Sequence, residues 1–352
     1  MAFLTVDNVA VRGIASCVPS QFEDNKEYPL FKNKEEFQTF YESTGIRYRH
    51  IAPLDVCASD LCLAAANKII EGLNWQRDSI DCLIFVSQTH DYILPATACI
   101  LQKRLELSND CMSFDVSLGC SGWAYGLNII SSLISNGKIK RGLLLVGDTL
   151  SRTNSRKDKS SWPLFGDAGS ATAFEYDVTA SQIFSLSNTD GAGADAILMP
   201  DGGFRNGFSY DSLKEFEDEN GNIKCKLNGF MNGMDVFSFA ITKVPKNIKK
   251  LMNEIHISDD NIDYYVFHQG NKFMDEMIVK KIKASSQKVL YSLDMYGNTS
   301  GASIPLTISH CLHDNIADKS MHILISGFGV GLSWSSSYIE LKNVYCPDVL
   351  TY

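Results

Sequence analysis

The sequence predicts an α/β protein built from two similar halves. Short apolar runs typical of buried strands alternate with longer segments typical of helices, which is the pattern of βαβ units with a mostly parallel sheet. The same order of segments recurs at a separation of about 180 residues. A chain of 352 residues exceeds the size at which one hydrophobic core stops growing, so two halves that share an interface are expected.

Composition and charge narrow the class of protein. With 45% hydrophobic and 21% charged residues the chain is typical of soluble globular proteins, and its net charge of -9 argues against a broad nucleic-acid surface. No apolar run is long enough to span a membrane and the N-terminus has no secretory signal, so we expect a cytoplasmic protein. The ten cysteines lack CxxC and disulfide-framework spacing, so we expect reduced thiols. His310, Cys311 and His313 do not share one helix face, and no metal site is predicted.

The expected elements of the first half alternate between strands and helices, with a polar segment at 21–41 that carries a short amphipathic helix. Strands are expected at Val6–Ala15, Ile80–Val86, Met112–Val116, Gly142–Gly147 and Ser170–Tyr176, and helices at Ser59–Leu73, Ala96–Leu105 and Ser121–Ile134. Gln182–Ser187 then starts the pattern again. We therefore divide the chain into an N-terminal half at 1–178 and a C-terminal half at 179–352.

The repeat between these halves is weak in residue identity and strong in order and spacing. The Ile-Asp pair at the entry of one apolar strand recurs 182 residues later. The matched segments are Ser79–Phe85 with Asn261–Phe267, Cys120–Leu127 with Asn298–Pro305, and Leu143–Gly147 with Ile323–Gly327. This pattern indicates a duplicated five-stranded unit whose halves are related by a pseudo-twofold axis.

Three segments stand apart from the repeat. The stretch 202–229 combines aromatic residues with the acidic run Lys214–Gly221, and we expect an exposed excursion, either a surface hairpin or a cap on a pocket. Gly229–Met252 is expected to form a long amphipathic helix with a kink at Pro245. The basic run at 152–159 is either a solvated loop or a patch for an acidic carrier.

Cys120 is the first candidate for chemistry. It lies where a strand turns into a helix, so unpaired backbone N–H groups and the helix dipole are expected to favour its thiolate, the form that attacks carbonyl groups. Gly119 and Gly122 let a substrate approach the sulfur. Taken alone, such a cysteine is more often an inert core residue, so partners elsewhere in the chain decide its role.

His268 and Asn298 are candidate partners. His268 follows an apolar strand in a polar, glycine-containing turn, and Asn298 stands opposite Cys120 in the repeat. If the halves pack about a twofold axis, two helix N-termini meet in one cleft and the strands deliver all three residues to the same edge. A lone histidine after a strand is more often structural, but the polar turn favours a functional role.

With these residues, six motifs resemble those of the 3-oxoacyl-[acyl-carrier-protein] synthase III family, condensing enzymes of the thiolase fold. The likeness is collinear over nearly the whole chain. The motifs are Thr44–Ile51, Gly119–Tyr125, Phe165–Ala171, His268–Asn271, Gly297–Pro305 and Gly327–Trp334. The resemblance implies a duplicated thiolase-like α/β fold with two five-stranded mixed sheets and helices sandwiched between them, in αβαβα layers.

The resemblance also implies a reaction, a decarboxylating Claisen condensation. Cys120 attacks an acyl thioester carried by CoA or acyl carrier protein, while its own N–H and that of Val330 hold the oxyanion. His268 and Asn298 donate hydrogen bonds to the thioester oxygen of malonyl-acyl carrier protein as carbon dioxide leaves. The enolate attacks the acyl-cysteine and releases a 3-oxoacyl thioester. No metal or redox cofactor is implied.

Further roles rest on the same resemblance. Substrate contacts are implied for Leu94, Phe165, Gly270 and Asn271. The loop that holds Leu94 closes the acyl pocket of a partner subunit, which implies a homodimer, and acyl carrier protein is a further implied partner. The glycines of Gly327–Gly331 are interpreted as a tight crossing between strands beneath the cysteine, because a strand rather than a helix follows them.

The sequence departs from the family where its members bind CoA. Thr39 and Lys159 stand where a tryptophan and an arginine clamp the adenine, and Ser43 and Ser238 replace two further basic residues. We therefore expect weak binding of CoA, and either an acyl donor delivered on a carrier protein or a specialised pathway, such as one for a surface glycan or a secondary metabolite.

Other functions stay open on the sequence alone. A same-fold acyltransferase would move the acyl group from Cys120 to an amine or hydroxyl without decarboxylation, with His268 as general base. A non-catalytic partner subunit would keep only the fold, and a cysteine hydrolase would combine Cys, His and Asn by convergence. No motif encodes the acyl chain length, the acceptor or the pathway.

Overall fold

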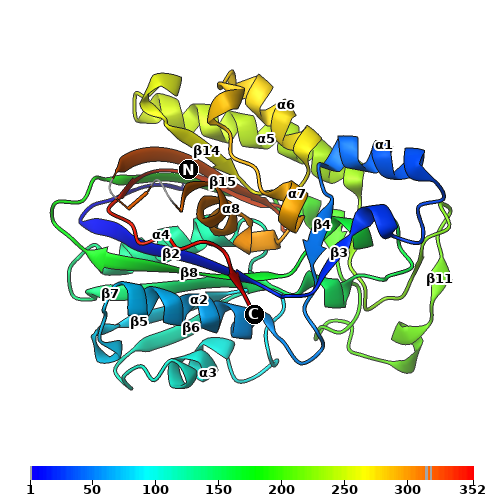
Figure 1. Ribbon diagram of the computed structural model, residues 1–352, viewed down its shortest axis with the longest axis horizontal. Helices are drawn as coiled ribbons and strands as arrows, with labels where there is room; N and C mark the ends of the chain where they lie inside the picture. Colours follow the sequence, from blue (N-terminus) through cyan, green and yellow to red (C-terminus); the bar gives the residue numbers. More distant parts are fainter. Residues whose placement is uncertain (1, 314–315, 318) are drawn as a thin grey trace.

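The computed structural model describes residues 2–313, 316–317 and 319–352, and two large β-sheets organise this part of the chain (Figure 1). The first has five strands in the spatial order β1, β9, β16, β15, β14, which span Ala2–Val6, Ile183–Thr189, Ser333–Lys342, Ser320–Gly329 and Tyr264–Phe267. The second has six strands in the order β17, β2, β8, β7, β5, β6, which span Leu350–Thr351, Val9–Val18, Ala168–Tyr176, Arg141–Asp148, Cys82–Val86 and Met112–Val116.

Helices and sheets alternate in five layers (Figure 1). α4 and α8 lie between the sheets, α2 and α3 cover the outer face of the six-stranded sheet, and α5 and α6 cover the five-stranded sheet. These helices span Gly122–Ile134 (α4), Ser303–Leu312 (α8), Ala58–Gly72 (α2), Thr97–Arg104 (α3), Gly233–Glu254 (α5) and Lys272–Ile282 (α6). α4 and α8 are apolar on most sides because each packs on two sheets. The predicted αβαβα layering is confirmed.

Strand pairing confirms the duplication and corrects the expected orientation of the strands. The order β2, β8, β7, β5 in one sheet matches β9, β16, β15, β14 in the other. In both sets the first three strands pair antiparallel and the last two pair in parallel. The expectation of a mostly parallel sheet is therefore wrong, whereas the mixed sheets implied by the resemblance are present.

The two ends of the chain cross between the halves. The expectation of a single strand at Val6–Ala15 is wrong. Asn8 adopts a left-handed backbone conformation (φ 63°) that separates β1 from β2. β1 pairs with β9 in the sheet of the C-terminal half, and β17 pairs with β2 in the sheet of the N-terminal half. β17 is also the sixth strand that the expectation of two five-stranded sheets lacks.

The excursion at 202–229 is exposed and mostly irregular. It contains a short hairpin of β11 (Phe216–Glu217) and β12 (Ile223–Lys224), and Phe204 and Tyr210 are 90% and 85% exposed. The segments that flank it pair with each other as β10 (Ile197–Leu198) and β13 (Phe230–Met231). α5 then begins at Gly233 rather than Gly229 and continues through Pro245.

The remaining elements form a lobe beside the sheets. It contains the antiparallel pair of β3 and β4, the predicted amphipathic helix α1 that lies between them in the chain, and the short helix α7 near Asn298 (Figure 1). Their bounds are Phe22–Asp24 (β3), Tyr48–His50 (β4), Lys34–Thr44 (α1) and Leu293–Tyr296 (α7). Among the residues described, no helix has both the length and the apolar character that a membrane span requires.

Candidate active site

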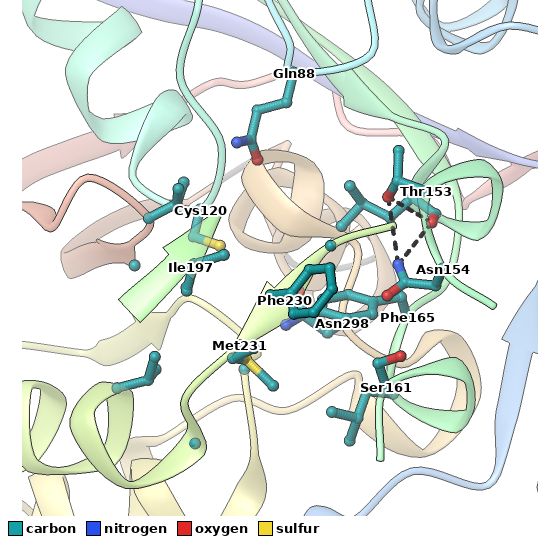
Figure 2. Close-up of a pocket in the computed structure, with 18 of the residues that line it drawn as sticks. Gln88, Cys120, Thr153, Asn154, Ser161, Phe165, Ile197, Phe230, Met231 and Asn298 are labelled. Atoms are coloured by element: carbon teal, nitrogen blue, oxygen red, sulfur yellow. Dashed lines mark hydrogen bonds between the residues drawn. The ribbon is translucent and has the colours of Figure 1, made fainter. Parts of the chain in front are cut away.

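Cys120, His268 and Asn298 lie in the wall of one cavity of about 450 Å³. Figure 2 shows Cys120 and Asn298 in this wall. Cys120 comes from the turn between β6 and α4, His268 from the end of β14, and Asn298 from the loop after α7. The structure therefore brings together residues from both halves of the chain. Four other residues singled out in the sequence line the same cavity, namely Phe165, Gly270, Asn271 and Val330.

Leu94 does not line the cavity of its own chain. It lies on the loop between β5 and α3, where its side chain is 78% exposed, and Tyr92 and Ile93 beside it are 63% and 76% exposed. The role expected for Leu94 is in the pocket of a partner subunit, and it stays a prediction. The exposed apolar loop is nevertheless a feature that a protein interface would cover.

Glycines hold the Cys120 turn tightly against its surroundings. A Cβ on Gly329 would lie 2.8 Å from the sulfur of Cys120 and 2.6 Å from its Cβ, so the chain at 329 packs directly on the Cys120 side chain. A Cβ on Gly119 would clash with Oε1 of Gln88. The side chain of Gln88 thus passes over the turn and borders the cavity beside Cys120 (Figure 2).

Burial raises the pKa of the Cys120 thiol to about 11. A hydrogen bond from the backbone N–H of Val330 acts in the opposite direction, and the nearby carboxylate of Asp148 raises the pKa further. The backbone N–H groups of Val330 and Cys120 thus favour the thiolate as expected, but burial raises the pKa by more, so the net shift is upward. With a pKa of about 11, the thiol keeps its proton at neutral pH.

His268 is buried and neutral. Burial lowers the pKa of its imidazole to about 4, and Phe328 packs edge-on against the ring. Nδ1 lies 2.9 Å from the hydroxyl of Ser303, which also accepts a bond from the N–H of Gln269. We assign the ring proton to Nε2, because the hydroxyl of Ser303 can then donate to Nδ1. His268 is then a neutral hydrogen-bond donor.

Asn298 is fixed by its backbone and by its own side chain. Its N–H donates to the carbonyl of Leu164 (2.9 Å), and its carbonyl accepts from the N–H of Gly166 (3.0 Å). Its Oδ1 accepts from the N–H of Ser300 (2.9 Å), where the backbone takes a left-handed turn (φ 53°). The amide nitrogen of Asn298 is left to donate into the cavity (Figure 2).

The rest of the cavity wall is largely apolar, and sequence reasoning missed this part. Five of the residues flank the excursion or start α5, namely Ile197, Leu198, Phe230, Met231 and Phe237. β10 and β13 have two residues each, which is too short for any periodic pattern. The available signal was the pair of apolar clusters on either side of a polar excursion.

In the basic run at 152–159, three of the four basic side chains are ion-paired, and the fourth, Arg152, donates to backbone carbonyls. Arg156 bonds to Glu23 (2.7 Å), Lys157 to Glu215 (2.7 Å) and Lys159 to Glu36 (2.9 Å). These pairs favour a structural surface loop over a patch for an acidic carrier. In the part of the chain that the structure describes, no group of three or more His, Cys, Asp or Glu residues is arranged to hold a metal ion.

The site as a whole combines one thiol with two neutral donors in an apolar cavity. Donors of this kind stabilise negative charge that develops on an oxygen atom, and they do so best where water is excluded. A nucleophilic sulfur next to them suits the chemistry of thioesters, which passes through oxyanions and enolates.

Comparison with known proteins agrees with this arrangement. Residues 114–197 match the family 3-oxoacyl-[acyl-carrier-protein (ACP)] synthase III, and residues 252–341 match its C-terminal part. The β-ketoacyl-[acyl-carrier-protein] synthase III of Lactococcus lactis is 30% identical over 331 residues, which is 93% of this chain and 98% of the relative. That of Caldanaerobacter subterraneus is 33% identical over 298 residues, which is 84% and 87% of the two chains.

Solved structures agree as well. The crystal structure of a 3-oxoacyl-(acyl-carrier protein) synthase from Burkholderia xenovorans superposes with a TM-score of 0.93 at 37% identity, over 99% of both chains. The fold is thus thiolase-like and the protein is an acyl-transferring enzyme. The chain belongs to the 3-oxoacyl-[acyl-carrier-protein] synthase III family of condensing enzymes.

Proposed function

We propose that the protein joins an acyl group held on Cys120 to a malonyl thioester, with loss of carbon dioxide, to give a 3-oxoacyl thioester. The observation that carries the proposal is the convergence of Cys120 with two neutral donors, His268 and Asn298, in one largely apolar cavity. Neither donor brings a positive charge that would hold the malonyl carboxylate in place, so the site leaves that group free to depart.

The first half-reaction loads the cysteine. The sulfur of Cys120 attacks the carbonyl carbon of an acyl thioester, and the backbone N–H groups of Cys120 and Val330 hold the resulting oxyanion. The S–C bond of the donor breaks, the acyl group stays on Cys120, and the thiol proton leaves with the donor's sulfur. Val330 already donates to the sulfur of Cys120, which supports its place beside the reacting carbon.

The second half-reaction forms the new carbon–carbon bond. Nε2–H of His268 and the amide N–H of Asn298 donate to the thioester oxygen of the malonyl group, and the bond to its carboxylate breaks to release carbon dioxide. The enolate attacks the acyl carbon on Cys120, and the sulfur leaves and takes up a proton. These steps move protons and electron pairs alone, so the proposal includes no metal and no redox cofactor.

The state of His268 favours this reaction over a simple acyl transfer to an amine or a hydroxyl. That alternative needs His268 to remove a proton from the acceptor. A pKa lowered to about 4 makes the imidazole a weak base at neutral pH, whereas donation from Nε2–H needs no change of protonation.

We further propose that the acyl groups arrive on an acyl carrier protein and that the enzyme acts as a cytoplasmic homodimer. α5 and α6 both begin at the cavity wall and carry exposed lysines on their outer sides, which suits an acidic carrier. These lysines are Lys246, Lys249, Lys250, Lys272, Lys280 and Lys281. Lys159 is bonded to Glu36 of α1, which leaves it poorly placed to clamp an adenine and supports a preference for carrier over free CoA.

The test combines intact mass spectrometry with a decarboxylation assay. The protein is incubated with a panel of acyl-CoA and acyl-carrier donors, and then with malonyl-acyl carrier protein. We expect a mass gain on Cys120 with at least one donor, carbon dioxide release that depends on Asn298, and higher kcat/KM for carrier than for CoA. Acyl transfer to an amine without carbon dioxide would instead support the alternative function, and absence of any mass gain would contradict both.

A further inference from the structure

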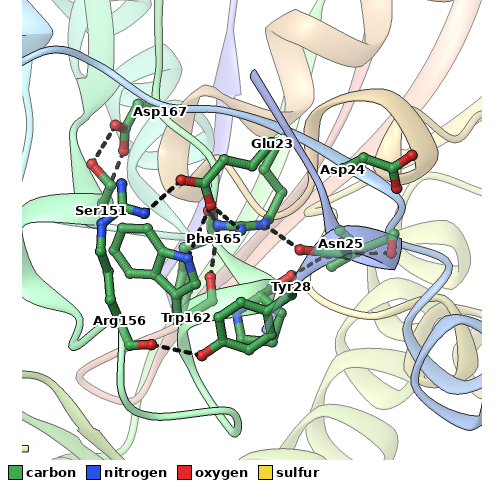
Figure 3. A network of polar contacts seen from close by, with 12 residues as sticks. Glu23, Asp24, Asn25, Tyr28, Ser151, Arg156, Trp162, Phe165 and Asp167 are labelled. Atoms are coloured by element: carbon green, nitrogen blue, oxygen red, sulfur yellow. Dashed lines mark hydrogen bonds and ion pairs between the residues drawn. The ribbon is translucent and has the colours of Figure 1, made fainter. Parts of the chain in front are cut away.

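Arg49 is a fully buried arginine that does not line the cavity but is hydrogen-bonded to the chain that forms part of its wall. It lies on β4, and its side chain is 1% exposed. Its Nε donates to Oδ1 of Asn25 (2.8 Å), and one terminal nitrogen donates to Glu23 (2.8 Å). The other terminal nitrogen donates to two backbone carbonyls, those of Trp162 (2.7 Å) and Phe165 (3.0 Å). Figure 3 shows Glu23, Asn25, Trp162 and Phe165 close together in one network of polar contacts.

The segment that Arg49 holds has every carbonyl from Trp162 to Phe165 bonded. Arg49 takes the first and the last of the four, and the side-chain amide of Asn25 donates to the carbonyl of Pro163 (2.8 Å). The fourth, that of Leu164, accepts from the N–H of Asn298 (2.9 Å). One short stretch of backbone is thus fixed on one side by Arg49 and carries Asn298 on the other.

Two further contacts connect Arg49 and this segment to Asn298. Residues 165 and 298 form a parallel bridge, completed by the bond from Gly166 N–H to the carbonyl of Asn298 (3.0 Å). The residue before Asn298 also packs on the arginine, since a Cβ on Gly297 would lie 3.0 Å from Cγ of Arg49 and 2.9 Å from the carbonyl of Leu164. A shift of Arg49 therefore moves both strands of the bridge.

We propose that Arg49 is a positioning residue for Asn298, and that it sets the place of the amide donor used in the malonyl step. This role rests on the proposed function and adds a residue outside the cavity to it. Arg49 touches no substrate. It acts through the carbonyls of Trp162 and Phe165 and through the bridge between residues 165 and 298.

The chemistry of the site explains why an arginine is present. A buried positive charge is costly unless it is paired and fully hydrogen-bonded, and here one carboxylate and three neutral oxygens meet that need. The planar guanidinium presents donors in fixed directions, so it bonds Glu23, Asn25 and both carbonyls at the same time. A lysine has one ammonium group and cannot span them. Substitution by lysine keeps the positive charge and removes most of these hydrogen bonds.

The experiment separates the two half-reactions and uses a double-mutant cycle with Arg49→Lys, Asn298→Ala and the double variant. Acylation of Cys120 is followed by intact mass, and the malonyl step by carbon dioxide release. Because a displacement of about 1 Å can cost about 100-fold in rate, we expect R49K to slow the malonyl step by about 10-fold to 100-fold. We expect acylation to stay within about threefold of wild type.

The cycle gives the decisive outcome. In the N298A background, R49K is expected to cause less than about a twofold further loss, because the group that it positions is already absent. An undiminished loss in that background, or equal loss of both half-reactions, would overturn the proposal. Arg12→Lys is the matched control, since Arg12 is an ion-paired arginine bonded to Glu175 and Asp177 away from the cavity.

The experiment remains decisive if R49K does not fold, and it distinguishes failure of the role of Arg49 from failure of the proposed function. If R49K does not fold, Glu23→Gln is run through the same cycle, because it keeps the shape of the Glu23 side chain and weakens the hold on Arg49. The same selective loss, smaller in size, is then expected, and a non-selective loss contradicts the role. If wild type loads Cys120 and decarboxylates but the cycle is additive, the role of Arg49 fails alone, whereas an inactive wild type means that the proposed function has failed and Arg49 with it.

Discussion

Gly329→Ala tests how closely the fold supports the nucleophile. A Cβ at this position lies 2.8 Å from the sulfur of Cys120 and 2.6 Å from its Cβ, whereas ordinary contacts begin at 3.4 Å. Either the sulfur or the backbone of the turn between β15 and β16 must therefore move by roughly 0.6–0.8 Å to restore ordinary contact. Displacement of a reacting atom by about this distance is expected to slow acylation of Cys120 by about 100-fold.

The assay is the rate at which an acyl donor adds mass to Cys120, measured by intact mass spectrometry at several donor concentrations. Gly207→Ala is the matched control, because nothing lies within 4 Å of a Cβ at that position. Gly207→Ala should unfold near the wild-type temperature and G329A at a lower one, because residue 329 has a φ of 158° that side chains rarely adopt. Acylation of G329A at the wild-type rate would refute the claim that residue 329 sets the position of the sulfur.

The remaining predictions concern protons near the cavity. Ser303→Ala removes the hydroxyl that donates to Nδ1 of His268, so carbon dioxide release should fall by about 10-fold while acylation of Cys120 is retained; equal loss in both assays would contradict the assigned tautomer. Asp148→Asn removes a negative charge that raises the pKa of Cys120, which is about 11. The pKa of Cys120, read from the pH dependence of iodoacetamide labelling, should therefore be lower in the variant than in wild type. An unchanged or higher pKa would contradict this expectation. His268 has a pKa of about 4 when folded and an ordinary value of 6.5, so the unfolded chain binds the proton first as the pH falls, and stability should decrease between pH 6.5 and about 4 by about 3 kcal/mol. Urea unfolding of wild type and His268→Gln across this range should show a steeper decline for wild type, and parallel curves would refute it. Lys280→Glu combined with Lys281→Glu should lower kcat/KM for a carrier-bound donor and leave that for a pantetheine thioester unchanged, which the same acylation assay measures.

The regular part of the fold was predictable because each element carries a local signal. β6 at Met112–Val116 was predicted with its observed bounds, and α4 starts within one residue of its prediction. Apolar runs bounded by glycine and polar residues mark such elements clearly. The left-handed turn at Asn8 carries no comparable signal, and β17 has two residues, so the crossing of the chain ends depends on pairings that no local pattern records.

The candidate site was predictable where the repeat aligned residues and unpredictable where packing decides. Cys120 and His268 follow strands as expected, whereas Asn298 follows the helix α7, so the expectation that a strand delivers it is wrong. The protonation state of Cys120 depends on how far it is buried, and the sequence shows only that a helix follows it. The support from Arg49 could not be predicted from the sequence either, because its hydrogen bonds join three segments that are distant in sequence.

The central claim is that Cys120 holds an acyl group while His268 and Asn298 promote loss of carbon dioxide from a malonyl thioester. One measurement tests it most directly, namely mass spectrometry of the products formed from a loaded enzyme and isotope-labelled malonyl-acyl carrier protein. The account predicts a 3-oxoacyl product that keeps two labelled malonyl carbons and releases the third as carbon dioxide, with product formation lost in Cys120→Ala. A product that carries the acyl group but no malonyl carbon would contradict it.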